Sequence, residues 1–276
     1  MKSRIIAGVI GAALTLIVLL VLPPIALNIA MAFLCGIAMY EILHVAQVQH
    51  VGLSLLSILF AASSPFLLLA KTYLVALAVI LLYMVALGII QVFSHQTLRV
   101  EQTGFVFMMS MLVPISLSCM AYFRGYSPQH GLFYIFLALI IAWMCDIGAF
   151  FVGTFWGRHK LCPSISPKKT VEGLIGGIVV SIFTSLLASW LYTLLSPVKG
   201  TFTICYWQIA LLSFVGSLLS VVGDLFASVI KRGCRTKDFG HIIPGHGGVM
   251  DRFDSLLFVT PALYLVVHVW PLAVPV

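Results

Sequence analysis

Charged residues are scarce in this chain, and their scarcity excludes an ordinary soluble domain. Only 8% of the 276 residues are Asp, Glu, Lys or Arg, whereas 62% are hydrophobic, and the mean hydropathy is +1.15. A soluble domain usually carries about a quarter of charged residues. Long uncharged apolar runs predict instead an all-α polytopic integral membrane protein. The weak ten-residue alternation of a transmembrane barrel is missing.

Cysteine is also sparse, and its spacing excludes two common kinds of site. The chain has six cysteines, no two of which form a CxxC pair, and most of them lie inside apolar runs. They are Cys35, Cys119, Cys145, Cys162, Cys205 and Cys234. This pattern favours small buried side chains over a disulfide framework or a zinc site.

The apolar runs predict about nine membrane-spanning helices. Each run is near the ~20 residues needed to cross the hydrocarbon core. The expected spans are 5–22, 25–43, 51–70, 72–93, 105–123, 131–153, 173–195, 207–230 and 255–273. Pro23-Pro24 predicts a tight turn between the first two. The first run resembles a signal peptide in its Lys2 and Arg4, but it is too long and a second run follows at once, so we interpret it as an uncleaved span.

The basic residues predict the orientation of these spans. With the N-terminus in the cytoplasm, 12 Lys and Arg residues fall in inside segments, and only Lys71, Arg124 and Lys199 fall outside, which accounts for all 15. All eight acids lie in inside loops or toward the inside ends of spans, and five of them lie beyond residue 170. We therefore expect residues 1–130 to be a scaffold of about five spans. Residues 131–276 are expected to be a catalytic region of about four spans with two polar cytoplasmic loops.

Two acids are expected inside the membrane at matching depth. Asp146 in span 131–153 and Asp224 in span 207–230 each lie roughly two helical turns from the inside end. An intramembrane carboxylate is costly unless it is paired, protonated or bound to a cation. Either acid could form a structural pair with a Lys or Arg of a neighbouring helix. Two acids at one depth favour a shared polar cavity, and oxygen ligands of this kind suit Mg²⁺.

Two polar segments carry most of the remaining charge. In 163–177, Ser166-Pro167 predicts a turn, and Lys168, Lys169 and Thr170 follow just before a span, as in a phosphate cradle. An ordinary basic cluster with a Thr helix cap explains the same residues equally well. The second segment, 230–255, holds five basic residues, three acids and two histidines among glycines.

The mixture of signs in 230–255 favours phosphoryl or nucleotidyl transfer. Asp251 and Asp254 are three apart, so on a helix they share one face. Glycines let backbone N–H groups approach an anion closely. Acids that hold a metal beside bases that hold phosphates are what such chemistry needs. His241 and His246 are expected to be hydrogen-bonding loop residues rather than metal ligands.

The segment SVIKRGCRTKDFGHIIPGHGGVMDRFD, 228–254, resembles the signature of phosphatidate cytidylyltransferases, also called CDP-diacylglycerol synthases. The matching positions are Ser228, Lys231-Arg232, Lys237-Asp238, Gly240, Pro244, His246-Gly247-Gly248, Asp251-Arg252 and Asp254. The segment SPKKTVEG, 166–173, is similar to the family's upstream Ser-Pro-x-Lys-Thr stretch. The resemblance covers about residues 140–255.

The resemblance implies a reaction and its requirements. CTP and phosphatidic acid would give CDP-diacylglycerol and pyrophosphate, with Mg²⁺ as cofactor, in a helical protein of the bacterial inner membrane. Asp224 and Asp251 would be the principal metal ligands. Asp146 and Asp254 would hold a second cation or organise the basic residues.

The residues that match the motifs predict how the substrates are held. Mg²⁺ would bridge CTP phosphates, and basic side chains would offset the remaining negative charge. The residues expected to bind or act on the phosphates are Ser166, Lys168, Lys169, Thr170, Arg232, Lys237, His246, Gly247, Gly248 and Arg252. The expected partners are CTP, phosphatidic acid and membrane lipid, without nucleic acid.

Two alternatives stay open from the sequence. One is a CTP-using enzyme that acts on an isoprenoid acceptor. The other is an ion-coupled transporter, because intramembrane acids also mark ion pathways. The sequence leaves open a homodimer.

Overall fold

The structure is a computed structural model that describes residues 11, 13–67, 73–127, 129–196, 200–242 and 247–275. It divides into two compact units, and each is described by itself. Unit 1 comprises Met1–Gly125 and Cys234–Arg252, and unit 2 comprises Tyr126–Gly233 and Phe253–Val276. The segment Cys234–Arg252 therefore groups with the N-terminal helices, whereas the sequence assigned it to the C-terminal region.

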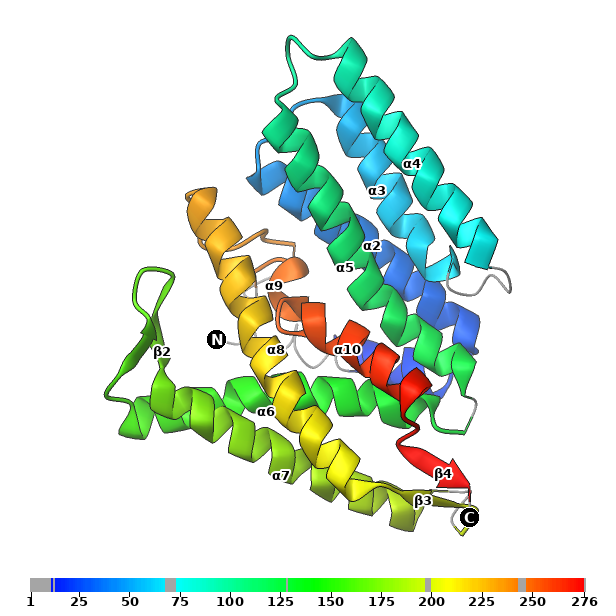
Figure 1. Ribbon diagram of the computed structural model, residues 1–276, viewed down its shortest axis with the longest axis vertical. Coiled ribbons are helices and arrows are strands. Elements are labelled where there is room, and N and C mark those ends of the chain that lie inside the picture. The colour runs from blue at the N-terminus through cyan, green and yellow to red at the C-terminus, as the bar shows by residue number, and fades with distance from the viewer. Residues whose placement is uncertain are drawn as a thin grey trace. The chain divides into compact units, whose positions relative to one another are not determined.

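Among its described residues, unit 1 contains four long apolar helices besides the helical residues 13–20. They are α2 (Pro24–Val45), α3 (Val51–Leu67), α4 (Tyr73–Phe93) and α5 (Val100–Tyr126) (Figure 1). Pro23 has an extended backbone just before α2, which confirms the turn predicted at Pro23-Pro24. Polar side chains join the helices inside the unit: Tyr83 Oη donates to Ser110 Oγ at 2.7 Å and lies 3.0 Å from Ser57 Oγ.

In the part of unit 2 that the structure describes, there are four long helices and two small antiparallel sheets. The helices are α6 (Gly131–Trp156), α7 (Val171–Leu195), α8 (Tyr206–Gly233) and α10 (Leu256–Val269). The strands are β1 (Lys160–Cys162), β2 (Ser166–Thr170), β3 (Phe202–Ile204) and β4 (Ala273–Pro275), which pair β1 with β2 and β3 with β4. A short helix, α9 (Met250–Phe253), crosses the boundary between the units along the chain.

Helices α6 and α7 lie side by side, joined by the β1–β2 hairpin (Figure 1). Glycine allows this close approach, because a Cβ at Gly177 would lie 2.6 Å from the Cys145 carbonyl oxygen. A Cβ at Gly148 would likewise lie 2.8 Å from Val180 Cβ. The close packing fixes the hairpin against the helix that carries Asp146.

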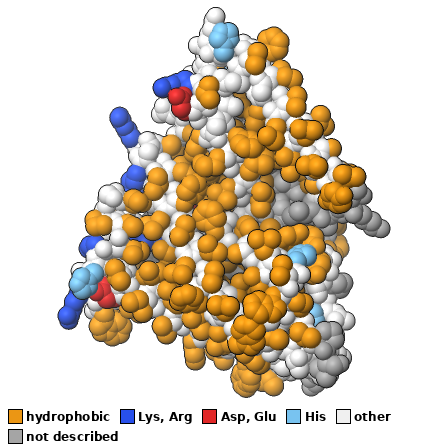
Figure 2. Space-filling view, in the orientation of Figure 1, with side chains coloured by type: hydrophobic (Ala, Val, Ile, Leu, Met, Phe, Trp, Pro, Cys, Tyr) orange, Lys and Arg blue, Asp and Glu red, His pale blue; other side chains and the backbone are white. Residues whose placement is uncertain are grey.

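The helices confirm the membrane class and revise some expected spans. Within the described residues, six helices are long and apolar enough to cross a membrane, namely α2, α4, α5, α6, α7 and α8. Apolar side chains accordingly cover most of the visible face (Figure 2). Helices α3 and α10 are apolar but shorter, with 17 and 14 residues. The span expected at 255–273 ends at Val269, since Pro271 cannot continue a helix. The first expected span, 5–22, lies partly outside the described residues.

The prediction that the cysteines are small buried side chains is confirmed for three of the six. All six cysteines are free, and Cys35, Cys119 and Cys145 are buried. The other three are partly exposed.

Candidate functional site

The two intramembrane acids of unit 2 lie on helices α6 and α8. Asp146 is ten residues before Trp156, and Asp224 is nine residues before Gly233. At 1.5 Å per residue these depths are about 15 and 14 Å, so both acids are deeper than the expected two turns because both helices continue beyond their predicted ends. The matching depth is retained. The two carboxylates interact electrostatically with each other, which places them in one polar region of the unit.

Lys169 forms an ion pair with Asp224. The Lys169 and Asp224 side chains are 23% and 26% exposed, so the pair is mostly shielded from solvent. Successive residues of a strand point to opposite faces, which explains why Lys169 turns inward while its neighbour Lys168 is exposed. Of the two neighbouring lysines of the β1–β2 hairpin, Lys169 therefore lies against the intramembrane acid Asp224.

Asp254 joins the same group of charges. Its Oδ2 lies 3.7 Å from Lys231 Nζ, with both side chains largely buried, and its Oδ1 accepts a hydrogen bond from the Ser255 backbone N–H at 2.9 Å. Burial, and after it the negative charge of Asp224, raise the pKa of Asp254 to about 7, although the Lys231 ammonium acts in the opposite direction. The Ser255 side chain hydrogen-bonds to Asp146. We call Asp146, Asp224 and Asp254 the acidic cluster.

The expectation that Asp251 and Asp254 share a helix face is wrong. Helix α9 has only four residues and ends at Phe253, and Asp254 lies in the turn that precedes α10. Asp251 and Asp254 therefore do not lie on one continuous helix, as the prediction assumed.

The local structure of 163–177 also differs from the expected turn at Ser166-Pro167. Both residues belong to strand β2, and the turn of the hairpin is formed by residues 163–165. Proline is tolerated because the strand is at a sheet edge and its missing N–H needs no partner. Thr170 is buried, and its Oγ1 accepts a hydrogen bond from the Gly173 N–H at 3.1 Å, so it caps α7. The helix-cap interpretation is confirmed for this residue, and its phosphate contact stays a prediction.

Asp251 in unit 1 organises the segment that precedes it. Its Oδ2 accepts hydrogen bonds from the Phe239 N–H at 2.8 Å and from the Gly248 N–H at 3.1 Å. Gly247 has a φ of +84°, a conformation that favours glycine. Asp251 therefore holds the ends of the glycine-rich segment close together through one oxygen.

Several predicted phosphate-binding residues are available at the surface, and one cannot be described. Lys168, Arg232, Lys237 and Arg252 are exposed, and Ser166 is partly exposed. His246 lies outside the described residues.

The predicted metal ligands remain a prediction. Asp224 belongs to unit 2 and Asp251 to unit 1, so their separation is not defined. In the described part of the chain, no three His, Cys, Asp or Glu side chains lie close enough to hold a metal ion by themselves. Magnesium commonly takes only one or two carboxylates and completes its coordination with water and phosphate oxygens. The all-oxygen donor set of the acidic cluster fits that preference.

The sequence did not assign a role to Glu41, which the structure shows to be buried in α2. Its carboxylate accepts hydrogen bonds from the Val249 and Met250 N–H groups, both at 3.0 Å. The sequence does show that Glu41 is an acid inside an apolar span. Such an acid is a functional candidate, because a carboxylate inside the membrane is costly in free energy. The partner segment, about 200 residues away, could not be read from the sequence.

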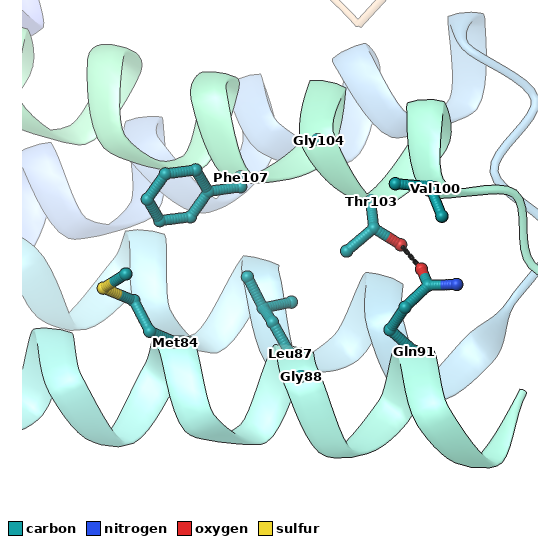
Figure 3. Close-up of a pocket in the computed structure, with 8 residues that line it drawn as sticks. All are labelled: Met84, Leu87, Gly88, Gln91, Val100, Thr103, Gly104 and Phe107. Carbon is teal, nitrogen blue, oxygen red and sulfur yellow. Dashed lines mark hydrogen bonds between the residues drawn. The ribbon is translucent and has the colours of Figure 1, made fainter. Parts of the chain in front are cut away.

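A cavity of about 340 Å³ lies between α4 and α5 in unit 1 (Figure 3). Thr103 and Gln91 point toward each other across it, with a hydrogen bond of 2.5 Å from Thr103 Oγ1 to Gln91 Oε1 (Figure 3). Its lining residues are Met84, Leu87, Gly88, Gln91, Val100, Thr103, Gly104 and Phe107. None of these residues is charged, so the cavity lacks the groups that would bind a triphosphate.

The model of the cytidylyltransferase family matches residues 2–270. The chain belongs to the cytidylyltransferase family. It is therefore a nucleotidyltransferase enzyme, as the sequence motif predicts.

Curated relatives agree with this assignment, and three of them carry the name phosphatidate cytidylyltransferase. The protein of Bacillus subtilis (strain 168) is 33% identical over 271 residues, 96% of each chain. Those of Staphylococcus saprophyticus and Staphylococcus epidermidis are 41% and 43% identical over 135 residues, 49% of each chain. The family resemblance predicted from the signature motif is confirmed.

Proposed function

We propose that this cytidylyltransferase transfers the cytidylyl group of CTP to phosphatidic acid, with Mg²⁺, at the cytoplasmic face of a bacterial cell membrane. The products are CDP-diacylglycerol and pyrophosphate. The observation that carries the proposal is the acidic cluster of unit 2 with its two lysines, Lys169 and Lys231, inside a chain of this family. The names of the relatives support the two substrates.

The donor chemistry of the acidic cluster supports a divalent cation. Burial first, and then the negative charges of Asp224 and Asp146, raise the pKa of Asp254 to about 7. A bound cation would relieve this repulsion. As the motif resemblance implies, Asp224 and Asp251 would be the principal Mg²⁺ ligands, and Asp146 and Asp254 would hold a second cation or organise the basic residues. When bound, Mg²⁺ neutralises phosphate charge and orients the triphosphate. A second cation remains a prediction.

The protein's own residues would supply positioning and charge neutralisation. An oxygen of the phosphatidate phosphate attacks the α-phosphorus of CTP, the new O–P bond forms, and the bond to the β-phosphate breaks as pyrophosphate leaves. The nucleophile is already anionic, so no strong general base is needed. Lys169 would offset charge on the triphosphate. We assign the same role to the exposed Arg232, Lys237 and Arg252, with Lys168, Gly247 and Gly248 as further phosphate contacts.

The depth of the acids is consistent with a lipid substrate. Asp146 and Asp224 lie about 15 and 14 Å from the ends of their helices, below the level of the charged loops. A phosphatidate headgroup entering from the bilayer and a nucleotide entering from water can both reach such a depth. The positive-inside distribution of Lys and Arg supports a cytoplasmic site.

Pyrophosphate release from the detergent-purified protein tests the proposal. CTP, phosphatidic acid and Mg²⁺ should together give pyrophosphate and CDP-diacylglycerol, and omission of any one should abolish release. A panel of lipid acceptors, including isoprenoid phosphates and alcohols, should show preference for phosphatidic acid. Release with an isoprenoid acceptor but none with phosphatidic acid would refute the substrate assignment. Asp224→Asn is the matched variant and should be inactive.

A further inference from the structure

Glu41 is a buried carboxylate that binds a distant part of the chain. Its residue is 2% exposed, and each of its two carboxylate oxygens accepts one backbone hydrogen bond. Val249 N–H donates to Oε1 and Met250 N–H donates to Oε2, both at 3.0 Å. A buried carboxylate is stable only when its oxygens are paired in this way. Helix α2 is thereby fastened to the start of α9.

Two glycines of the signature segment enclose the same carboxylate. A Cβ added at Gly248 would lie 2.8 Å from Glu41 Cδ, and a Cβ added at Gly240 would also lie 2.8 Å from that atom. These distances are too short for a real side chain, so the backbone approaches Glu41 from both positions. Gly240 and Gly248 therefore allow the backbone to lie close to the Glu41 carboxylate.

Asp251 fastens the same segment through a second carboxylate. Its Oδ2 accepts from the Phe239 and Gly248 N–H groups. Gly248 thus lies close to the Glu41 carboxylate and donates its backbone N–H to Asp251. Movement of Glu41 would displace the backbone that fixes the orientation of Asp251.

We infer that Glu41 is a positioning residue for the reaction: it holds Val249 and Met250 of the signature motif, and through them it orients Asp251. This inference rests on the proposed function for its catalytic consequence, whereas the contact itself does not depend on it. Glu41 touches no substrate in this scheme, and it acts through the backbone of Val249 and Met250.

Glu41→Gln tests the inference with little change in size. The amide nitrogen of Gln is a donor, so one of the two backbone N–H groups loses its acceptor. We expect about a 30-fold fall in kcat, which corresponds to about 2 kcal/mol at 1.36 kcal/mol per tenfold. The Mg²⁺ concentration for half-maximal rate should rise as well, because Asp251 is displaced. A mere loss of folded protein would leave that concentration unchanged.

Hydrogen exchange measured by mass spectrometry gives a readout that needs no activity. Peptides covering 239–252 should exchange faster in Glu41→Gln than in the unaltered protein, while peptides of α7 should not change. Glu101→Gln is the matched control, since Glu101 is also a glutamate of unit 1 but its side chain is 80% exposed. It should leave kcat, the Mg²⁺ dependence and the exchange pattern unchanged.

The outcomes separate this inference from the proposed function. If the unaltered protein releases no pyrophosphate, the proposed function fails, and the exchange measurement still decides whether Glu41 holds the segment. Unchanged exchange in 239–252 would overturn the inference. Faster exchange with unchanged kcat would overturn the positioning role.

Gly240→Ala provides a second variant that leaves α2 intact. The new Cβ would press on the Glu41 carboxylate, since it would lie 2.8 Å from Glu41 Cδ. It should reproduce the faster exchange and the higher Mg²⁺ requirement even where Glu41→Gln does not fold. Behaviour identical to that of the unaltered protein would show that the contact with Glu41 is dispensable.

Discussion

Replacement of Lys169 by methionine is the sharpest test of the acidic cluster. The Lys169 ammonium pairs with Asp224, and the two side chains are 23% and 26% exposed. Methionine retains most of the apolar stem but removes the charge. The change therefore isolates the electrostatic role of Lys169 from its packing.

The structure sets the size of the expected effect. Two unit charges about 4 Å apart interact by about 4 kcal/mol at an effective dielectric constant of about 20. Because roughly a quarter of each side chain meets solvent, screening lowers this to about 2–3 kcal/mol. A similar loss of charge neutralisation on the triphosphate would reduce kcat by about 100-fold, at 1.36 kcal/mol per tenfold.

Pyrophosphate release by purified Lys169→Met measures this loss. Lys160→Met is the control, because Lys160 is exposed on strand β1 of the same hairpin and its replacement also removes one positive charge. The control should stay within about threefold of the unaltered protein, as exposed charges contribute little. A Lys169→Met variant that keeps near-normal kcat would refute the role of Lys169. An equal fall in kcat in both variants would show that the positive charge of the hairpin matters in general, and not the pairing of Lys169 with Asp224.

Three further predictions concern Asp251, the cation and the helix packing. Asp251→Asn should lower kcat at least about 100-fold while the protein still inserts, since both its charge and its loop contacts are weakened, and near-normal pyrophosphate release would contradict its assignment. Chelation of divalent cations should abolish release and added Mg²⁺ should restore it, whereas full activity in chelator would exclude the cation requirement. Gly177→Ala should cost about 1–3 kcal/mol and lower the melting temperature in detergent, because its Cβ would lie 2.6 Å from the Cys145 carbonyl oxygen. Gly88→Ala is the control, because a Cβ at Gly88 would have no atom within 4 Å, and its melting temperature should equal that of the unaltered protein. Equal melting temperatures for Gly177→Ala and Gly88→Ala would show that α6 and α7 accommodate the new Cβ without loss of stability.

The membrane class and the approximate helices were predictable from the sequence, because they depend on local composition. Uncharged apolar runs of about 20 residues have few alternatives to a spanning helix. The same locality explains the errors. Ser166-Pro167 reads locally as a turn, but pairing with Lys160–Cys162 makes it a strand. The prediction that Asp251 and Asp254 share a helix face was wrong because α9 ends at Phe253.

The candidate site was predictable in its residues but not in its pairings. The signature motif and the two intramembrane acids identified the family and most candidate residues. The partner of Asp224 is 55 residues away in the chain, and the partners of Glu41 are 208 and 209 residues away. No local spacing encodes such contacts, because they depend on how the helices pack.

By itself, the sequence determined that this chain is a helical membrane enzyme of the cytidylyltransferase family, with its charge concentrated in a few polar segments. Hydrophobic runs and a long motif are properties of consecutive residues, so they can be read directly. Only the tertiary structure decided that Lys169 faces Asp224. It also decided that Glu41 is surrounded by the backbone of the signature segment. Those facts depend on side-chain direction and on the close approach of distant backbones, which are fixed only when the chain is folded.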